Sequence, residues 1–336
     1  MSMSKRFGSK DQAALFLSFY AMVGWRVEPM RSCASNLLRG FESGLSIGDA
    51  HSAFHSTLQH IRFAFYSGEN LQKILKDIDY YLGLMAEYNN EMVKNFMLIH
   101  RETLSTLFDK GEASSIDEKA VYANANGSDI CNADDQHFLT SYCYKIVQSF
   151  WLGHHERCNH QMGNLPLNLS MIHLNEIWIR FYFGMNALQL LRKNGLAAQV
   201  KIYEESIAIL IEAEENSSGS FRNKILLMKA ELMSIDRVRG AEEMYDAAID
   251  AARMNGFVHE EGLACERAAH HYLNCYNVEK RLFLLEKSWQ YFLLAKNCYQ
   301  KWGSKMKVNS IDRELEKLWA NDSMQLFRTS ILPGGM

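Results

Sequence analysis

Residues 241–256 read AEEMYDAAIDAARMNG, and they decide the fold because their pattern occurs twice in the chain. Small and aromatic residues recur there at three- and four-residue steps, the spacing of one helix face, at Ala241, Tyr245, Ala248 and Ala252. A glycine, Gly256, follows this stripe. The same stripe with its closing glycine recurs 47 residues later, at Ser288, Phe292, Ala295, Tyr299 and Gly303. A fainter copy begins at Tyr203, with Ile207 opposite Ile249.

This repetition indicates stacked helix pairs. Helical repeats with periods of about 34–47 residues build solenoids, because one helix pair cannot bury both of its faces alone. Alanine lets a neighbouring helix approach closely, and the aromatic side chain fills the space one turn away. The sequence therefore predicts an all-α fold, an α-solenoid of antiparallel helix pairs similar to a tetratricopeptide superhelix.

Helical periodicity extends over most of the chain. One stripe comprises Leu71, Ile74, Leu75, Ile78, Tyr81, Leu82 and Met85. Another comprises Phe138, Tyr142, Ile146, Phe150 and Trp151. No segment shows sustained period-two alternation, so no strand is predicted. Six turns each end one helical stretch and begin the next, at Gly48-Asp49, Gly68-Glu69, Gly153-His154, Asn194-Gly195, Asn255-Gly256 and Gly303-Ser304. The carboxylate of Asp49 is expected to cap the helix after it.

One polar segment interrupts the helical pattern. It is rich in Gly, Ser and Asp and is predicted to be a long loop or insert. The predicted organisation is a disordered N-terminus at 1–10, helical-repeat blocks at 11–108 and 137–319, the insert at 109–136, and a flexible tail at 320–336.

Composition excludes some classes of protein. With 48% hydrophobic residues among 336, the chain has enough apolar material for a core, which excludes a wholly disordered protein. The 36 Lys and Arg residues are balanced by 39 Asp and Glu, whereas a dedicated nucleic-acid binder carries a basic excess. We therefore expect no nucleic-acid partner.

Cysteine usage and the N-terminus predict a compartment. The seven cysteines are odd in number and widely spaced, which favours free thiols in the cytoplasm over a disulfide framework. Lys5, Arg6 and Lys10 precede the apolar stretch 13–25, which has roughly the length of a signal peptide. Asp11 at its start favours a buried first helix, and the stretch is too short to span a bilayer. We expect a cytoplasmic chain without membrane contact.

Several stretches resemble a known family. YDAAI at 245–249 and NGFVHEEGLACE at 255–266 resemble the tetratricopeptide-like helical region of large multidomain AAA/STAND-type signalling ATPases. AKNCYQKWGSKMKV at 295–308 resembles the closing helix pair of that region. GWRVEP at 24–29 and GLSIGD at 44–49 resemble its opening repeats. The resemblance covers most of residues 20–315.

The resemblance implies a regulatory segment. In that family the ATPase is flanked by a serine/threonine-kinase-like domain and by a histidine kinase or cyclase, and none of these parts is present in this chain. Ser304 stands where the family has alanine, and Leu315-Glu316 stands where it often has Tyr-Pro. The resemblance therefore transfers no catalytic residue, and it implies a cytoplasmic signalling scaffold.

Motifs for chemistry are scarce. The chain has no P-loop, dinucleotide-binding fingerprint or nucleophile elbow. His154, His155, Cys158 and His160 are residue types that bind zinc. However, His155 and His160 are five residues apart and diverge on a helix, whereas chelation from one face needs a spacing of four.

The remaining candidates for ligands or catalysts are weaker. His51 and His55 share a helix face but are only half of a metal site, and the adjacent His270 and His271 point in different directions. Asp134-Asp135 lacks the third carboxylate of a magnesium–pyrophosphate motif, since Phe138 takes that place. Glu260, Glu261 and Glu266 are expected on a solvated helix face. We assign no catalytic, cofactor-binding or metal-binding residue.

The aromatic residues suggest a function. Five tryptophans, Trp151, Trp178, Trp289, Trp302 and Trp319, fall in helical stretches and are expected to pack between repeats. Those that remain exposed are expected to dock a partner peptide or helix in a concave groove, or adjacent domains of a longer signalling protein. The sequence therefore predicts a non-catalytic interaction scaffold. Two alternatives remain open, an all-α metal- or pyrophosphate-dependent enzyme and a fragment of a larger signalling ATPase without independent activity.

Overall fold

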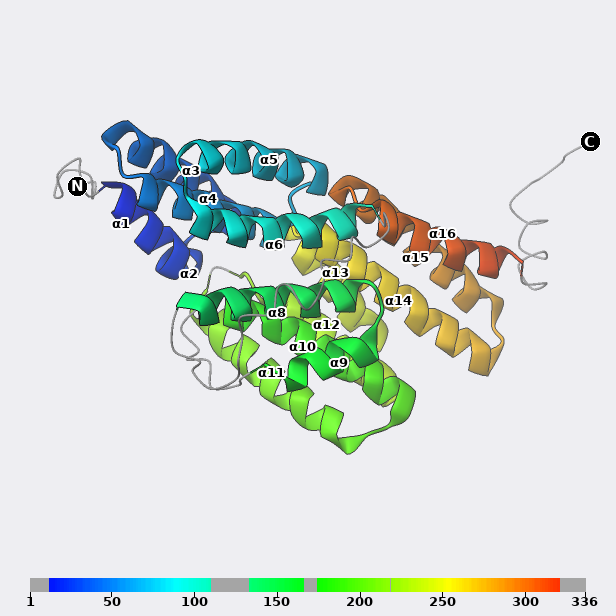
Figure 1. Ribbon diagram of the computed structural model, residues 1–336. Helices are drawn as coiled ribbons and strands as arrows, with labels where there is room; N and C mark the ends of the chain where they lie inside the picture. Colours follow the sequence, from blue (N-terminus) through cyan, green and yellow to red (C-terminus); the bar gives the residue numbers. More distant parts are fainter. Residues whose placement is uncertain (1–11, 110–132, 166–173, 218, 321–336) are drawn as a thin grey trace, which may run out of the picture. The chain divides into compact units, whose positions relative to one another are not determined.

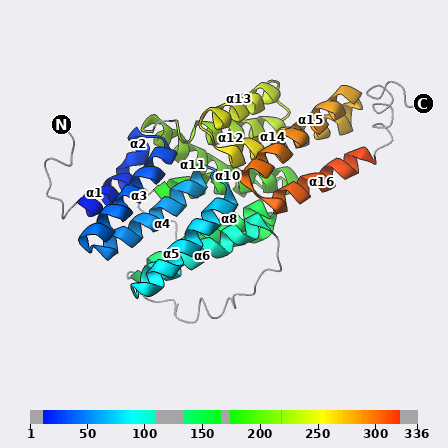
Figure 2. The ribbon, with the colours of Figure 1, turned by 90° about the horizontal axis from the view of Figure 1, so that it is seen from above.

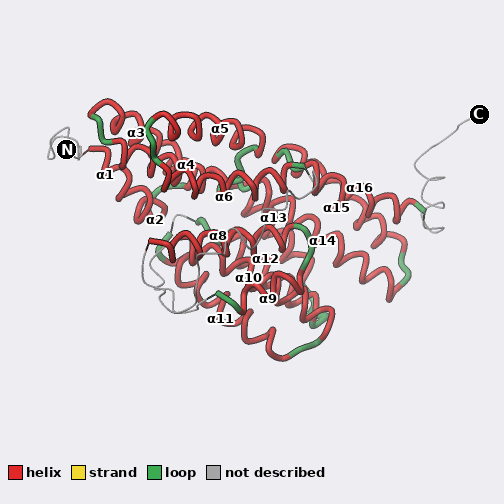
Figure 3. The backbone as a smooth tube through the Cα atoms, in the orientation of Figure 1, coloured by secondary structure: helices red, strands yellow, loops and turns green. Residues whose placement is uncertain are grey.

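A computed structural model describes residues 12–109, 133–165, 174–217 and 219–320, with 133–141 described by their backbone alone. These residues form helices joined by short connections, and no strand occurs among them (Figure 3). The prediction of an all-α fold is confirmed. The chain divides into two compact units, Met1–Phe221 and Arg222–Met336, here called unit 1 and unit 2. This division falls inside the block predicted for 137–319.

The N-terminal apolar stretch of unit 1 is one continuous helical segment that contains a π-helical turn. It comprises α1 (Gln12–Phe19), a π-helical turn η3 (Tyr20–Gly24) and α2 (Trp25–Val27). Trp25 is fully buried, and its ring packs edge-on against Phe221 with centroids 5.8 Å apart. Met22 and Val23 are exposed, so the first helical stretch is buried on one face only. The expectation of a buried first helix is correct for that face alone.

Helices α3 (Met30–Ile47) and α4 (Ala50–Tyr66) form the next pair of unit 1. They approach so closely that a Cβ atom on Gly44 would lie 2.9 Å from Cβ of Ala53. Gly48 ends α3 with a φ of 77°, a left-handed conformation that glycine adopts at little cost. The carboxylate of Asp49 accepts a hydrogen bond of 3.0 Å from the backbone N–H of Ser52. The predicted cap of α4 is therefore confirmed.

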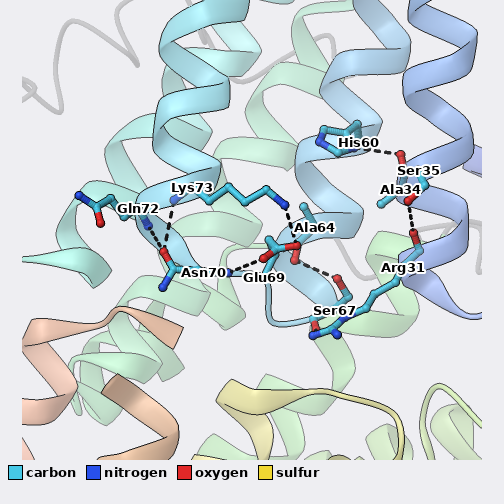
Figure 4. A network of polar contacts seen from close by, with 10 residues as sticks. All are labelled: Arg31, Ala34, Ser35, His60, Ala64, Ser67, Glu69, Asn70, Gln72 and Lys73. Carbon is cyan, nitrogen blue, oxygen red and sulfur yellow. Dashed lines mark hydrogen bonds and ion pairs between the residues drawn. The ribbon is translucent and has the colours of Figure 1, made fainter. Parts of the chain in front are cut away.

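Polar contacts fix the turn between α4 and α5 (Figure 4). Asn70 caps α5 by accepting hydrogen bonds from the backbone N–H groups of Gln72 and Lys73 at 3.0 and 3.3 Å. Lys73 in turn pairs with Glu69 at 3.1 Å. On the α3 side, the Nδ1–H of His60 donates to the carbonyl oxygen of Ala34 at 2.9 Å, which ties α4 to α3.

The other helices of unit 1 continue the pairing. They are α5 (Leu71–Glu87), α6 (Glu91–Phe108), α8 (Ala133–Trp151), α9 (His155–Gly163), α10 (Leu174–Asn194) and α11 (Ala197–Glu215). In Figure 2, α5 and α6 lie side by side, as do α3 and α4. The stripe predicted for α5 faces the core, with Leu75 and Leu82 half-buried at its edges. Most of the predicted insert falls on residues 110–132, outside the described residues.

All six predicted turns are confirmed. Each contains a glycine with positive φ, at Gly48, Gly68, Gly153, Gly195, Gly256 and Gly303. In every case a helix ends just before the glycine or at it and another begins within a few residues.

Unit 2 consists of α12 (Arg222–Ile235), α13 (Ala241–Met254), α14 (Val258–Glu279), α15 (Leu282–Trp302) and α16 (Lys305–Trp319). Consecutive helices pack on each other, and α14 and α15 lie side by side (Figure 1). Both copies of the sequence stripe are buried, the first on α13 and the second on α15. The sequence repeat therefore corresponds to a repeat in burial.

Candidate functional site

The 47-residue repeat relates positions on α14 to positions on α16. Comparison of the two helices shows that α16 carries a different surface. The face of α14 that packs on α15 carries small residues and one tyrosine, at Gly262, Cys265, Ala269 and Tyr272. Ser288 of α15 donates a hydrogen bond of 2.9 Å to the carbonyl oxygen of Ala269. The ring of Tyr272 stacks on that of Tyr291, with centroids 5.4 Å apart. This face of α14 is thus covered by α15.

The positions 47 residues later on α16 carry a different surface. They are Asn309, Asp312, Glu316 and Trp319, three polar residues and one tryptophan. Trp319 is 45% exposed, whereas Tyr272 is 9% exposed. Asn309 and Glu316 are also exposed, whereas Asp312 is half-buried.

Trp319 belongs to a partly exposed seam between α15 and α16. Its ring lies against Trp289 of α15, with centroids 5.4 Å apart. Two turns away, Lys296 of α15 pairs with Asp312 of α16 at 2.6 Å. Leu293 lies between Trp289 and Lys296 on the α15 side, and its side chain is exposed. We call Trp289, Leu293, Lys296, Asp312 and Trp319 the α15–α16 seam.

The chemistry of the seam suits contact with another chain. Tryptophan combines a large apolar area with little conformational freedom, so exposed tryptophans are frequent anchors in interfaces. The flanking ion pair supplies a polar rim.

A buried ion pair anchors α16 beneath the seam. Lys307 at the start of α16 pairs with Glu266 of α14 at 2.7 Å, and the hydroxyl of Tyr299 donates to the same carboxylate at 2.5 Å. Burial acts to raise the pKa of Glu266, but Lys307, His270 and Tyr299 outweigh it and hold the pKa below its usual range. The carboxylate is therefore ionised and bound.

Two further buried pairs join α12 to α14. Arg267 binds Glu231 through two N–H groups at 3.0 and 3.1 Å, and Tyr245 donates to Glu231 at 2.5 Å. Lys224 binds Glu260 at 2.7 Å with both side chains fully buried. These contacts correct the sequence analysis, because Glu260 and Glu266 do not lie on a solvated face. Only Glu261 fits that expectation, since it is partly exposed and pairs with the exposed Arg253 at 2.9 Å.

Unit 1 contains a buried polar cluster that sequence analysis missed. The Nε–H of Arg62 on α4 donates to Nε2 of His100 on α6 at 3.2 Å, and Nδ1–H of His100 donates to the carbonyl oxygen of Phe96 at 2.7 Å. Burial, with the adjacent Arg62, lowers the pKa of His100 to about 3. His100 is therefore neutral. The charged residue inside IRFAFY, at 61–66, was the one sequence signal for this cluster.

The histidine and cysteine residues of α9 do not converge. His154 and His160 are exposed, whereas the Nδ1 of His155 lies 2.9 Å from the Oδ1 of Asn186 on α10. The Cys158 thiol is buried against Met162 and donates to the carbonyl oxygen of Ile146 at 3.6 Å. A shallow hollow of about 250 Å³ adjoins this helix start, lined by residues 153–157, Gln189, Leu190 and Lys193.

The other candidate residues are placed as follows. His51 and His55 share a face of α4 as predicted, with ring centroids 4.2 Å apart. His270 packs on Phe292, whereas His271 contacts Ser234, so the two diverge as predicted. Asp134-Asp135 lies in the first turn of α8.

Two kinds of feature are absent from the described part of the chain. No group of three or more His, Cys, Asp or Glu residues there is arranged to hold a metal ion. No helix there combines the length and the apolar character that crossing a bilayer requires.

Comparison with known proteins gives no relative. No family model matches the chain, and neither a curated protein nor a solved structure is similar to it.

Proposed function

We propose that this protein is a non-catalytic helical-repeat scaffold that binds a protein partner through the α15–α16 seam. The observation that carries this proposal is the exposed Trp319, which packs on the half-buried Trp289, because the corresponding position on α14, Tyr272, is covered by a neighbouring helix. The partner is expected to present an apolar side chain on a helix or an extended segment.

An α-solenoid is the architecture that fits this proposal. Its support is the packing of consecutive helices in unit 2 and the burial of both stripes separated by 47 residues. The resemblance to the repeat region of signalling ATPases supplies the proposed setting, a cytoplasmic signalling protein in which this chain is a regulatory segment.

Two leucines on α15 provide a matched test. Leu293 lies on the seam and Leu294 is the next residue around the helix, and their exposed fractions are 45% and 44%. The experiment captures partners of the full chain from a cell extract by cross-linking and compares Leu293→Glu with Leu294→Glu. Leu293→Glu and Trp319→Ala are expected to lose a partner that Leu294→Glu retains.

The size of the effect follows from the energetics of interface anchors. Truncation of an anchor tryptophan costs about 2 kcal/mol or more, which weakens binding roughly 30-fold. Equal recovery of the same proteins by all variants, each folded by circular dichroism, would show that the seam is not the binding surface.

The fragment alternative has a separate test. A fragment without independent stability would expose apolar faces at its ends and melt without cooperativity. We expect a cooperative thermal transition for the isolated chain, recorded by circular dichroism.

A further inference from the structure

Two thiols meet between α14 and α15 of unit 2. Cys265 is on α14 and Cys298 is on α15, and both are buried. A Cβ atom on Gly262, one turn before Cys265, would lie 3.0 Å from Cβ of Cys298. Because there is no space for a side chain at Gly262, the two helices approach closely there. The side chain of Cys265, one turn further along α14, interacts with that of Cys298.

The two thiols differ in acidity. The hydrogen bond between them is the largest influence on both pKa values, and it raises the pKa of Cys265 and lowers the pKa of Cys298. Burial and Glu261 act to raise the pKa of Cys298, whereas the positive charges of Lys301 and Arg253 act to lower it. The thiolate is the reactive form of cysteine, and we assign the role of nucleophile to Cys298 because it is also the more exposed of the two thiols.

Cys298 also lies near the surface. The side chain of Arg253, which is half-exposed, and that of Lys301, which is exposed, are close enough to influence it. Cys298 is 5% exposed and Cys265 is not exposed. A small oxidant therefore reaches Cys298 before Cys265.

We propose that Cys265 and Cys298 form an oxidation site that a peroxide converts into a reversible disulfide between α14 and α15. The thiolate of Cys298 attacks one oxygen of hydrogen peroxide, the O–O bond breaks, and a sulfenic acid and hydroxide are produced. The thiol of Cys265 then attacks the sulfur of Cys298, the S–O bond breaks, and the departing hydroxide takes up the proton of Cys265 as water. Overall, two thiols and one peroxide give one disulfide and two waters.

The disulfide would fasten one helix pair to the next. Cys265 belongs to the pair α13–α14 and Cys298 to the pair α15–α16, which carries the seam. Oxidation therefore removes the freedom of these two pairs to separate. The chemistry of the site does not depend on whether the seam binds a partner.

Peptide mapping tests the proposal on the full chain. The reduced protein is exposed to hydrogen peroxide while native, remaining thiols are alkylated, and trypsin is added. Cleavage after Arg253, Arg267, Lys296 and Lys301 gives peptides 254–267 and 297–301, each with one cysteine. We expect these two peptides as the dominant linked pair, separated again by dithiothreitol. Their absence from oxidised protein that retains its circular dichroism would overturn the proposal.

Three variants separate the steps. Cys298→Ser abolishes the link, whereas Cys265→Ser leaves a sulfenic acid on Cys298 that dimedone traps. Cys158→Ser is the matched control, because Cys158 is equally buried but its sulfur faces Met162 at 4.0 Å and not a second thiol. This control is expected to form the link as the unchanged protein does. Labelling of other cysteines by dimedone, but not of Cys298, would contradict the assignment of Cys298 as the nucleophile. A Cys265–Cys298 disulfide that forms only after the protein unfolds would contradict the proposed site in the folded protein.

Discussion

Lys224 and Glu260 form an ion pair of 2.7 Å in which neither side chain has any exposed surface. Asn223 donates a further hydrogen bond of 2.6 Å to the same carboxylate oxygen. Removal of one charge from such a pair leaves the other charge buried without compensation, which is costlier than loss of the pair as a whole.

Lys224→Met is therefore expected to destabilise the protein by about 3–5 kcal/mol. The measurement is the free energy of unfolding in urea. The double variant Lys224→Met/Glu260→Met is expected to recover part of this loss, since no buried charge remains.

An exposed pair gives the control for this prediction. Lys73 and Glu69 are also paired, at 3.1 Å, but both side chains are substantially exposed. Lys73→Met is expected to cost no more than about 1 kcal/mol. Equal costs at Lys73 and Lys224 would contradict the cost assigned to an uncompensated buried charge.

Gly262→Ala is expected to destabilise the protein by about 1–3 kcal/mol, because the added methyl group overpacks the contact between α14 and α15. The new atom would lie 2.9 Å from Cε1 of Tyr299. Gly83→Ala on α5 is the matched control, since nothing lies within 4 Å of its new atom. That variant is expected to stabilise the protein by about 0.5–1 kcal/mol through helix propensity. Thermal and urea denaturation of both variants decide the matter, and a stable Gly262→Ala would show that the helices separate easily.

Stability is expected to fall with acidification because of His100. Its pKa is lowered from 6.5 to about 3 in the folded protein, so the unfolded chain binds the proton first. The contribution of neutral His100 is complete above about pH 6.5 and is lost as the pH falls towards 3, by about 1.4 kcal/mol per pH unit. His270, whose pKa is lowered to about 4 by burial and Arg267, acts in the same direction.

Urea denaturation at pH 7.5 and at pH 5 measures this dependence. His100→Gln retains an acceptor for Arg62 but no longer titrates, so its stability is expected to fall less between the two pH values. His154→Gln, at an exposed position, is expected to keep the original dependence. An unchanged slope in His100→Gln would contradict the role given to this histidine.

Asp49→Ala is expected to cost about 1 kcal/mol at neutral pH, because it removes the cap of α4. Hydrogen bonds from Ser52 lower the pKa of Asp49, so the benefit of the cap is present above its ordinary pKa of 3.8 and is lost as the pH falls below it. The difference between the two proteins should therefore shrink at pH 3. Urea denaturation at both pH values records it.

Local features of this fold were predictable from the sequence. The glycine turns, the cap at Asp49 and the stripes on α5, α13 and α15 are all encoded within a few residues, because helix period and turn chemistry depend on near neighbours. The division of the chain after Phe221 depends instead on contacts between residues that are distant in the sequence, so local patterns do not predict it.

Long-range partners were not predictable. Glu260 and Glu266 look solvated because a charged residue on a helix usually is, and only the fold brings Lys224 and Lys307 to them. The contrast between Tyr272 and Trp319 also depends on the neighbouring helix, since both are aromatic residues at equivalent positions. Periodicity shows which face of a helix is apolar, but it does not show whether another helix covers that face.

The ion pairs of unit 2 join helices that are close in the sequence. Arg267 lies 36 residues after Glu231, and Lys307 lies 41 residues after Glu266. During synthesis, Glu231 and Glu266 leave the ribosome before their basic partners, Arg267 and Lys307. Unit 2 would therefore assemble progressively from its N-terminal helices.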